Sequence, residues 1–257
     1  MKRYLIITAC LLLIAQASFA QNARFTTQGV IEYEKKVNMY ALIKDQVNKN
    51  PDRSYYAQAY EDFQKKNPQF KILKSSLKFS KGQTLFTPSD EDVAGNGFFD
   101  FESAAQNNII ETNTTAQTSI AQKQVFEQTY LLKDSTRKIN WKITNEIRNI
   151  AGYDCRRANA LIMDSIYVVA FYTDEIPVSG GPESFSGLPG MILGVALPYE
   201  HITWFATSVL DQPITDDKLK APIKGKPVDK QQLTTILKAA TKDWGVWGQD
   251  ALKAFLL

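Results

Sequence analysis

The chain has 257 residues, of which 44% are hydrophobic, and 30 lysines and arginines stand against 27 aspartates and glutamates. This length and apolar content suit a globular protein with a sizeable core, and residues 21–257 are predicted to form a single domain. A net charge of +3 gives no long-range field for nucleic acid or an anionic membrane, so neither is expected as a partner.

The N-terminal segment, residues 1–20, has the pattern of a secretory signal peptide. Lys2 and Arg3 give a positive start, and residues 5–15 form an apolar stretch too short to span a bilayer. Ser18 and Ala20 supply the small residues of a cleavage site. We therefore expect export through a cleaved signal peptide, to the periplasm or in association with the outer membrane. No later segment reaches the roughly 18 unbroken apolar residues of a membrane helix, so no transmembrane segment is predicted.

The rest of the chain alternates short strand patterns with turn formers. Ile31 and Tyr33 alternate with charged residues over residues 27–37, as in a half-buried strand. Aromatic residues three and four positions apart predict a helix over residues 52–66, and Asp229 is predicted to cap a final helix. Further strands are predicted over residues 70–79, 83–86, 109–115, 121–133, 140–143, 146–150, 155–162, 166–173, 191–197 and 201–210.

This succession predicts a mainly β (α+β) fold. Many short strands at close spacing favour a largely antiparallel sheet. We expect a curved antiparallel sheet or a partly open barrel, with one early helical insert and a C-terminal helix. The apolar tail, residues 251–257, is expected to dock back onto the sheet.

The second half of the chain carries five motifs in a fixed order. They are Trp141-Lys142-Ile143, Gly152-Tyr153-Asp154-Cys155-Arg156-Arg157-Ala158, Ala170-Phe171-Tyr172-Thr173, Ile176-Pro177-Val178-Ser179-Gly180-Gly181-Pro182 and Gly187-Leu188-Pro189-Gly190-Met191-Ile192. Together they resemble the GLPGLI family, with Met191 in place of the leucine in the family name. Phe171 stands where the family usually has tryptophan, and the Gly-Arg pair often found ahead of that strand is absent.

The resemblance implies a compartment and a kind of partner. GLPGLI proteins are exported proteins, chiefly of Bacteroidota, without an established activity, and they are often encoded beside TonB-dependent outer-membrane receptors. This implies an accessory role in envelope transport, with a TonB-dependent receptor or another envelope protein as the partner. The resemblance names no small ligand.

Residues 174–190, here called the signature loop, separate two predicted strands. Proline fixes φ at about −65° and glycine tolerates positive φ, so Pro189-Gly190 suits the centre of a type II turn. One interpretation is a rigid double turn that closes the sheet. The other is a loop that presents backbone donors and an aromatic ring to a ligand or partner. The candidate binding residues are Gly181, Pro182, Phe185, Gly187, Leu188, Pro189 and Gly190.

Cys155 is the one cysteine that remains once Cys10 in the predicted signal peptide is set aside, so no intramolecular disulfide is expected. On its predicted strand it shares a face with Tyr153 and Arg157. A buried thiol that acts as a small apolar side chain is the favoured interpretation. The alternative is a nucleophile activated by His201, the one histidine of the chain.

Other chemistry finds little support in the sequence. One histidine and one free cysteine do not make a zinc or copper site without carboxylates, and the acidic run Asp90-Glu91-Asp92 lacks the spacing of a calcium loop. Asp174 and Glu175 are the carboxylates beside the signature loop that a hydrolase could use. Adjacent strand residues point to opposite faces, so they share a site only if the chain turns there. No catalytic set, cofactor or metal site is predicted.

The sequence therefore predicts an exported envelope protein of unestablished activity. The favoured function is a non-enzymatic binding or accessory factor linked to TonB-dependent outer-membrane transport. The alternatives are a secreted hydrolase-type enzyme and a structural or assembly factor of the envelope. A binding module would show a defined pocket with convergent polar groups, whereas an assembly factor would show an exposed apolar patch.

Overall fold

The computed structural model describes residues 25–49, 53–89, 99, 101–105 and 107–257. The predicted signal peptide and the acidic residues 90–92 lie outside the described residues. The strands are β1 (Gln28–Asn38), β2 (Phe70–Ser80), β3 (Gln83–Pro88), β4 (Ile109–Asn113), β5 (Thr118–Val125), β6 (Gln128–Ser135), β7 (Lys142–Ile150), β8 (Tyr153–Ile162), β9 (Ile166–Thr173), β10 (Met191–Leu197), β11 (Ile202–Leu210) and β12 (Lys226–Val228). The helices are α2 (Met39–Lys49), α3 (Arg53–Lys66), α4 (Lys230–Ala240) and α5 (Val246–Leu256), with the short 3-10 helices η3 (Glu102–Ala104), η4 (Pro198–Glu200) and η5 (Asp216–Leu219).

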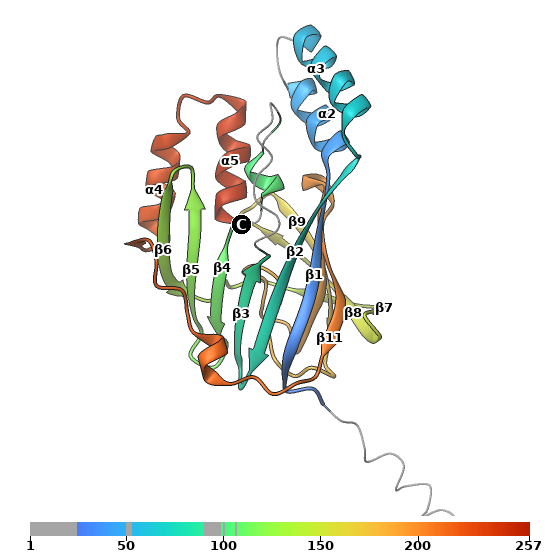
Figure 1. Ribbon diagram of the computed structural model, residues 1–257, viewed down its shortest axis with the longest axis vertical. Coiled ribbons are helices and arrows are strands. Elements are labelled where there is room, and N and C mark those ends of the chain that lie inside the picture. Colours follow the sequence, from blue (N-terminus) through green and yellow to red (C-terminus); the bar gives the residue numbers. More distant parts are fainter. Residues whose placement is uncertain (1–24, 50–52, 90–98, 100, 106) are drawn as a thin grey trace, which may run out of the picture.

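These strands join one sheet in the order β12-β6-β5-β4-β3-β2-β1-β11-β10-β9-β8-β7. Neighbours are antiparallel, except that β12 runs parallel to β6. The sheet curls, so that β1, β2 and β3 lie in front of β8 and β9, while α4 and α5 stand at the end of the sheet near α2 (Figure 1). The predicted fold class, a mainly β protein with a curved open sheet, is confirmed.

Three apolar clusters follow from this curl. The largest packs α2 against the sheet near Val37 and Trp204, and the second lies further along β1, around Ile31 and Tyr33. In the third, Leu233 and other side chains of α4 cover β5 and β6. Alternation along β1 sends every second side chain to the inner face of the curled sheet. The interior therefore receives residues from strands far apart in the chain.

Helix α2 is an element that the strand and turn patterns did not predict. Its buried residues recur at helical spacing, with Leu42, Ile43 and Gln46 among them. The side-chain oxygen of Asn38 accepts a hydrogen bond from the N–H of Ala41 at 3.2 Å, as an N-cap does. The signal was therefore present as a helical period directly after a strand period, which a single pass for alternation misses.

Two predicted strand boundaries were wrong as well. Residues 121–133 form a hairpin, β5 and β6, because the chain turns at Phe126, which has a φ of 53°. Residues 140–143 and 146–150 belong largely to one strand, β7, with a register shift between Ile143 and Ile147.

The apolar tail is helical, and it docks onto the sheet through Lys123 of β5. None of the helices in the described ranges is long and apolar enough to cross a membrane.

Candidate functional site

The signature loop runs through the interior of the curled sheet. Ile176 belongs to one large apolar cluster, and Phe185 and Leu188 belong to the other, so the loop joins both. The ring of Phe185 lies 6.1 Å from that of Trp204 on β11. The main-chain N–H of Met191 donates to the carbonyl oxygen of Ile176 at 3.0 Å. The loop therefore fills space between strands that the sequence places far apart.

Glycine is required in this loop by close packing. A Cβ on Gly190 would lie 2.1 Å from the carbonyl oxygen of Thr173, and one on Gly181 would lie 2.8 Å from Cβ of Ile192. Among the glycines of this loop, the positive φ, 92°, belongs to Gly187. The expectation that Gly190 serves a type II turn through a positive φ was therefore wrong. Glycine is required at this position because a side chain would clash with the backbone at the end of β9.

Hydrogen bonds hold both the loop and the start of β10 in place. Nε1 of Trp141 donates to the carbonyl oxygen of Ser186 at 2.9 Å, which links the first of the five motifs to the residue directly before the last motif. The hydroxyl of Tyr33 donates to the carbonyl oxygen of Ile192 at 2.6 Å. Of the seven candidate binding residues, five are buried, while Gly187 and Pro189 are exposed. This arrangement favours the rigid double turn, and ligand contact by these residues stays a prediction.

Cys155 is a free, fully buried thiol in the same cluster as Tyr33. Burial raises the pKa of this thiol to about 12, and the charges of Asp154 and Glu175 act in the same direction. The thiolate is the nucleophilic form of cysteine, and a raised pKa leaves little of it at neutral pH. The environment agrees with the structural interpretation of Cys155.

We expect Cys155 in the native protein to react with a thiol reagent such as DTNB about a thousandfold more slowly than in guanidinium, because a pKa of about 12 in place of 9.0 removes that share of thiolate. Absorbance at pH 8 measures both rates. The reaction of the unfolded protein is the control, because it shows that the reagent is active and counts the thiols that can be labelled. Labelling of the native protein at the unfolded rate would contradict the buried assignment.

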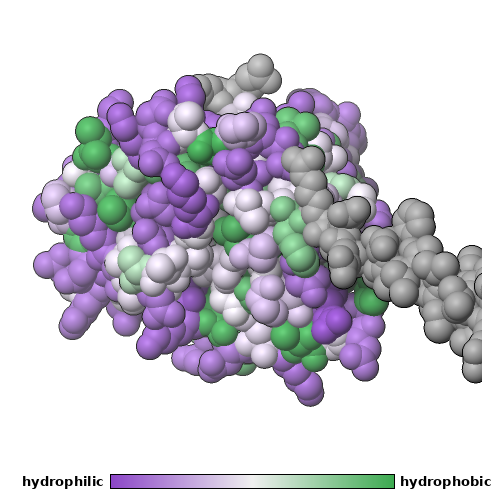
Figure 2. Space-filling view, turned by 90° about the horizontal axis from the view of Figure 1, so that it is seen from below, coloured by the Kyte–Doolittle hydropathy of each residue, from purple (hydrophilic) through white to green (hydrophobic). Residues whose placement is uncertain are grey.

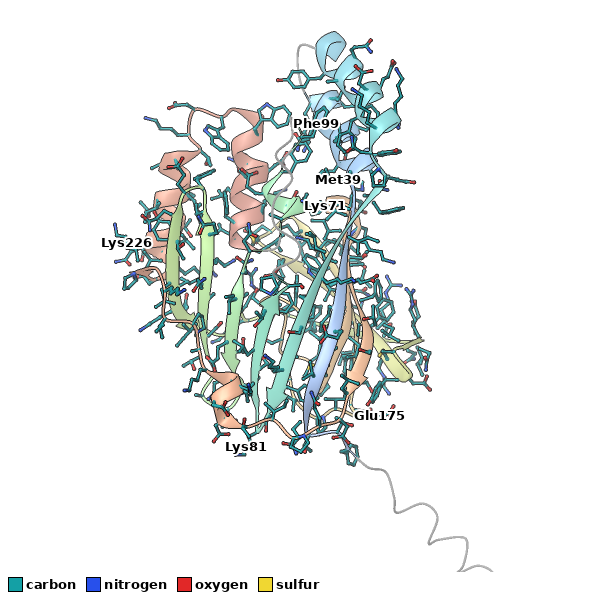
Figure 3. The ribbon with its side chains drawn as sticks, viewed as in Figure 1. Met39, Lys71, Lys81, Phe99, Glu175 and Lys226 are labelled. Atoms are coloured by element: carbon teal, nitrogen blue, oxygen red, sulfur yellow. The ribbon has the colours of Figure 1, made fainter. Side chains whose placement is uncertain are left out.

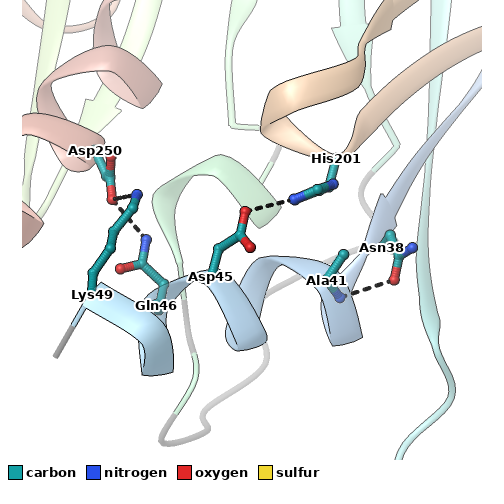
Figure 4. Close-up of polar contacts among 7 residues, drawn as sticks. All are labelled: Asn38, Ala41, Asp45, Gln46, Lys49, His201 and Asp250. Carbon is teal, nitrogen blue, oxygen red and sulfur yellow. Dashed lines mark hydrogen bonds and ion pairs between the residues drawn. The ribbon is translucent and has the colours of Figure 1, made fainter. Parts of the chain in front are cut away.

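The other candidate catalytic residues do not assemble into a site. His201 faces α2, where Nε2 lies 2.8 Å from Oδ2 of Asp45 (Figure 4), so its partner is this carboxylate. Glu175 lies at the opposite end of the sheet from Met39 and α2 (Figure 3). Asp174 and Glu175 are exposed on a turn. In the described part of the chain, no group of three or more His, Cys, Asp or Glu side chains could hold a metal.

The structure instead reveals a set of buried charges on the inner face of the sheet. Lys35 of β1, Lys123 of β5 and Glu183 of the signature loop are 4%, 5% and 6% exposed. Arg137, which follows β6, is partly buried beside them. Glu183 has a φ of 51°, unusual for a residue with a Cβ, and its Oε2 accepts a hydrogen bond from Asn108 at 2.8 Å. No ion pair within 4 Å joins Glu183 to a cation among the described residues.

The three cations and Glu183 nevertheless share one electrostatic environment. Burial lowers the pKa of Lys35 to about 8 and that of Lys123 to about 8, and the charge of Glu183 acts against both shifts. Burial also lowers the pKa of Arg137, again opposed by Glu183. Charges in such surroundings mark candidate functional sites, since their burial costs stability.

A cavity of about 240 Å³ opens beside these charges. Its walls include Lys35, Glu183 and the rings of Phe185 and Trp204. Nζ of Lys35 lies 4.9 Å from the centre of the Trp204 ring and donates to the carbonyl oxygen of Ala105 at 2.5 Å. Apolar walls with a few convergent polar groups are the usual make-up of a small-ligand site. We call this the interior cavity.

Sequence reasoning missed the charged residues of the interior cavity, although one signal existed. Lys35 stands at the same alternating positions of β1 as Ile31, Tyr33 and Val37, which all face inward. A charge on the apolar face of a strand is a stronger functional hint than a charge on the polar face. Lys123 and Arg137 lie beside this cavity without lining it. Nothing local singled them out, because their positions depend on the hairpin at Phe126.

Over the described residues, the surface at one end of the molecule carries no large apolar patch (Figure 2). Figure 2 shows apolar side chains scattered among polar ones at the end of the sheet remote from the helices. Scattered apolar residues are normal on a protein surface and mark no interface. The view gives no support at this end for the alternative of an assembly factor.

Comparison with known proteins adds a short family match and a fold match. Residues 161–194 match a family model described as a protein of unknown function (Porph_ging). The matched segment comprises part of β8, β9, the signature loop and the start of β10. No curated protein matches the chain.

Two solved structures resemble the fold. They are PNGF-II in space groups P21 and C2, with TM-scores of 0.50 and 0.52 at 17% and 15% sequence identity. The similarity covers 82% and 81% of this chain but 33% and 32% of those chains. The chain thus spans about a third of the PNGF-II structures, and at this identity the likeness shows the fold alone.

Proposed function

We propose that the protein is a non-enzymatic binding factor of the bacterial envelope, and that the interior cavity holds its ligand. The observation that carries the proposal is the burial of Lys35 and Glu183 in the walls of the interior cavity, with Lys123 buried beside them. Buried charges cost stability unless they are paired, and the structure pairs none of these three with an opposite charge within 4 Å among the described residues. A ligand with complementary groups would offset that cost.

The place in the envelope is supported by sequence. Residues 1–20 have a signal-peptide pattern, and the five ordered motifs resemble GLPGLI proteins. Their frequent neighbours, TonB-dependent receptors, make such a receptor the partner that we propose. The binding factor would act as an accessory to outer-membrane transport. Cys155 and the glycines of the signature loop would hold the fold, whereas Glu183 would face the ligand.

The test is affinity purification of the tagged protein from its native envelope, with mass spectrometry of retained proteins and of small molecules released on denaturation. We expect a receptor and one recurrent small molecule with the natural chain. Glu183→Gln should lose at least about tenfold of the small molecule, because it removes the charge that faces the cavity while keeping the side-chain shape.

Asp174→Asn is the matched control, because Asp174 is an exposed carboxylate in the same loop. It should retain the receptor and the small molecule at the natural level. Circular dichroism of all three proteins checks that they are folded. Recovery of the protein alone, with neither a receptor nor a small molecule, would refute the proposed function.

A further inference from the structure

A second cavity, of about 440 Å³, lies among the helices at one end of the sheet. Its walls come from α2, from α5 and from η4, and Figure 4 shows polar side chains of this region. It meets the interior cavity at Phe101, Glu102 and Ser103, which line both spaces. Lys35 and Glu183 line the interior cavity and not this one. We call this second space the helix cavity.

Aromatic side chains line the helix cavity from several elements. They are Tyr56, Phe99, Phe101, Tyr199, Trp244 and Trp247. The rings of Tyr56 on α3 and Trp247 on α5 lie 6.2 Å apart. Tyr199 and Trp244 are 74% and 39% exposed, so these rings stand where the cavity meets solvent. The face of such a ring attracts both apolar groups and positive charge, most strongly for tryptophan. The wall therefore suits an organic cation.

Acidic side chains outnumber basic ones around the helix cavity. Its ionisable residues are the carboxylates Asp45, Glu102, Glu200 and Asp250, the lysines Lys49 and Lys253, and His201. Nζ of Lys49 lies 2.9 Å from Oδ2 of Asp250, and Nε2 of His201 lies 2.8 Å from Oδ2 of Asp45 (Figure 4). Even with His201 protonated, four carboxylates stand against three cations. This negative balance favours a cationic ligand over an anionic one.

One hydrogen-bond acceptor in this wall has no partner. Gln46 on α2 is 4% exposed and lines the helix cavity. Its Nε2 donates to Oδ2 of Asp250 at 2.8 Å, whereas its Oε1 has no hydrogen-bond partner among the described residues. Buried polar atoms in proteins are nearly always hydrogen-bonded, and an unsatisfied one costs stability. A ligand that brings an N–H or O–H group to Gln46 would remove this cost.

One carboxylate of the helix cavity is left without an ion pair. Glu200 in η4 is half-buried, and no cation lies within 4 Å of its carboxylate in the described part of the chain. The contact between His201 and Asp45 joins the end of η4 to α2, and the neighbours of these two residues, Glu200 and Gln46, line the same cavity. A negative charge and an unpaired acceptor thus border one space. A primary ammonium ion, which carries a positive charge and three N–H donors, matches both.

We propose that the helix cavity binds a small primary amine with an apolar body, in its protonated form. The ammonium group donates to Oε1 of Gln46 and Glu200 balances its charge, while the aromatic wall contacts the apolar body. A carboxylate would add to the excess of negative charge, and a neutral alcohol would leave that excess unbalanced. This site is additional to the interior cavity, whose Lys35 and Glu183 do not line it, so either proposal can fail without the other.

Calorimetric titration with phenethylamine at about pH 7, where an alkylamine is protonated, tests the site. The matched probe is phenethyl alcohol, which keeps the ring and an O–H donor but has no charge. We expect phenethylamine to bind, and phenethyl alcohol to bind at least about tenfold more weakly. Equal binding of the two would overturn the cationic ligand. Absence of phenethylamine binding to the natural chain would overturn the site.

Substitutions separate the hydrogen bond from the charge, with circular dichroism to check that each variant is folded. Gln46→Met removes the acceptor and should weaken phenethylamine binding at least about fivefold, whereas phenethyltrimethylammonium, which has no N–H, should change by less than about twofold. Glu200→Gln should weaken binding of both cations about three- to fivefold. The control Glu127→Gln, in the exposed turn between β5 and β6, should change neither. Equal weakening of both cations by Gln46→Met would overturn the hydrogen bond, and unchanged binding in Glu200→Gln would overturn the role of that charge.

Discussion

Replacing Gly190 with alanine is expected to lower the free energy of unfolding by about 3 kcal/mol, through overpacking at the end of β9. The new Cβ would lie 2.1 Å from the carbonyl oxygen of Thr173 and 2.8 Å from its carbonyl carbon. Both are backbone atoms of a buried strand residue, so no flexible side chain can move aside. The signature loop would have to shift, and with it the rings that line the interior cavity. Chemical denaturation followed by tryptophan fluorescence measures the change.

Pro189→Ala is the matched control, because Pro189 is the exposed neighbour in the same turn. It should cost less than about 1 kcal/mol, since its main loss is the restriction of the unfolded chain. If both substitutions lowered the free energy of unfolding equally, the geometry of the turn, and not close packing at Gly190, would explain why Pro189-Gly190 is needed. A stable Gly190→Ala protein would contradict the packing of the signature loop against β9.

The fold was predictable from sequence where the pattern is local. Alternation predicted β1, and the short gap between the strands predicted over residues 70–79 and 83–86 agrees with the hairpin that β2 and β3 form. The pairing of β1 with β11 depends on residues far apart in the chain, and no local pattern reports it. The curl of the sheet follows from that pairing. The residues that line its interior could therefore not be predicted from the sequence. Helix α2 was missed because it begins at Met39, directly after β1 ends at Asn38. The helical spacing of its apolar residues therefore follows the strand alternation without a gap.

The candidate site divides in the same way. The buried thiol of Cys155 was predictable because strand alternation and a missing base are both visible in the sequence. The signature loop was found by its motifs, but the reason for Gly190 was not, because the atom it must avoid belongs to Thr173 on the preceding strand. Glu183 and Lys123 were missed, since a charged residue beside a turn or in a hairpin is solvent-exposed in most proteins.

The stability of the natural chain relative to Lys35→Met is expected to rise by about 2 kcal/mol between roughly pH 7.5 and pH 10. Burial lowers the pKa of Lys35 from 10.5 to about 8, with Glu183 opposing the shift and Lys71 adding to it. Between these values the unfolded chain binds the proton that the folded chain has released. The free energy of unfolding therefore increases with pH across this window, and the penalty of the buried charge is fully present below it. Denaturation of both proteins across the pH series measures the difference.

Lys36→Met separates this effect from a general change in charge, because Lys36 is the exposed neighbour of Lys35 on β1. Its stability difference from the natural chain should stay constant within about 0.5 kcal/mol over the same series. A constant difference for Lys35→Met would show that water reaches this ammonium and would remove Lys35 from the buried set. The expected dependence on pH bears on function. A buried lysine that lowers stability at neutral pH is costly to the free protein, and a bound ligand that pairs with its charge would offset that cost. A ligand that pairs with the Lys35 ammonium in the folded chain would raise its pKa again, and should therefore flatten this dependence of stability on pH for the natural chain.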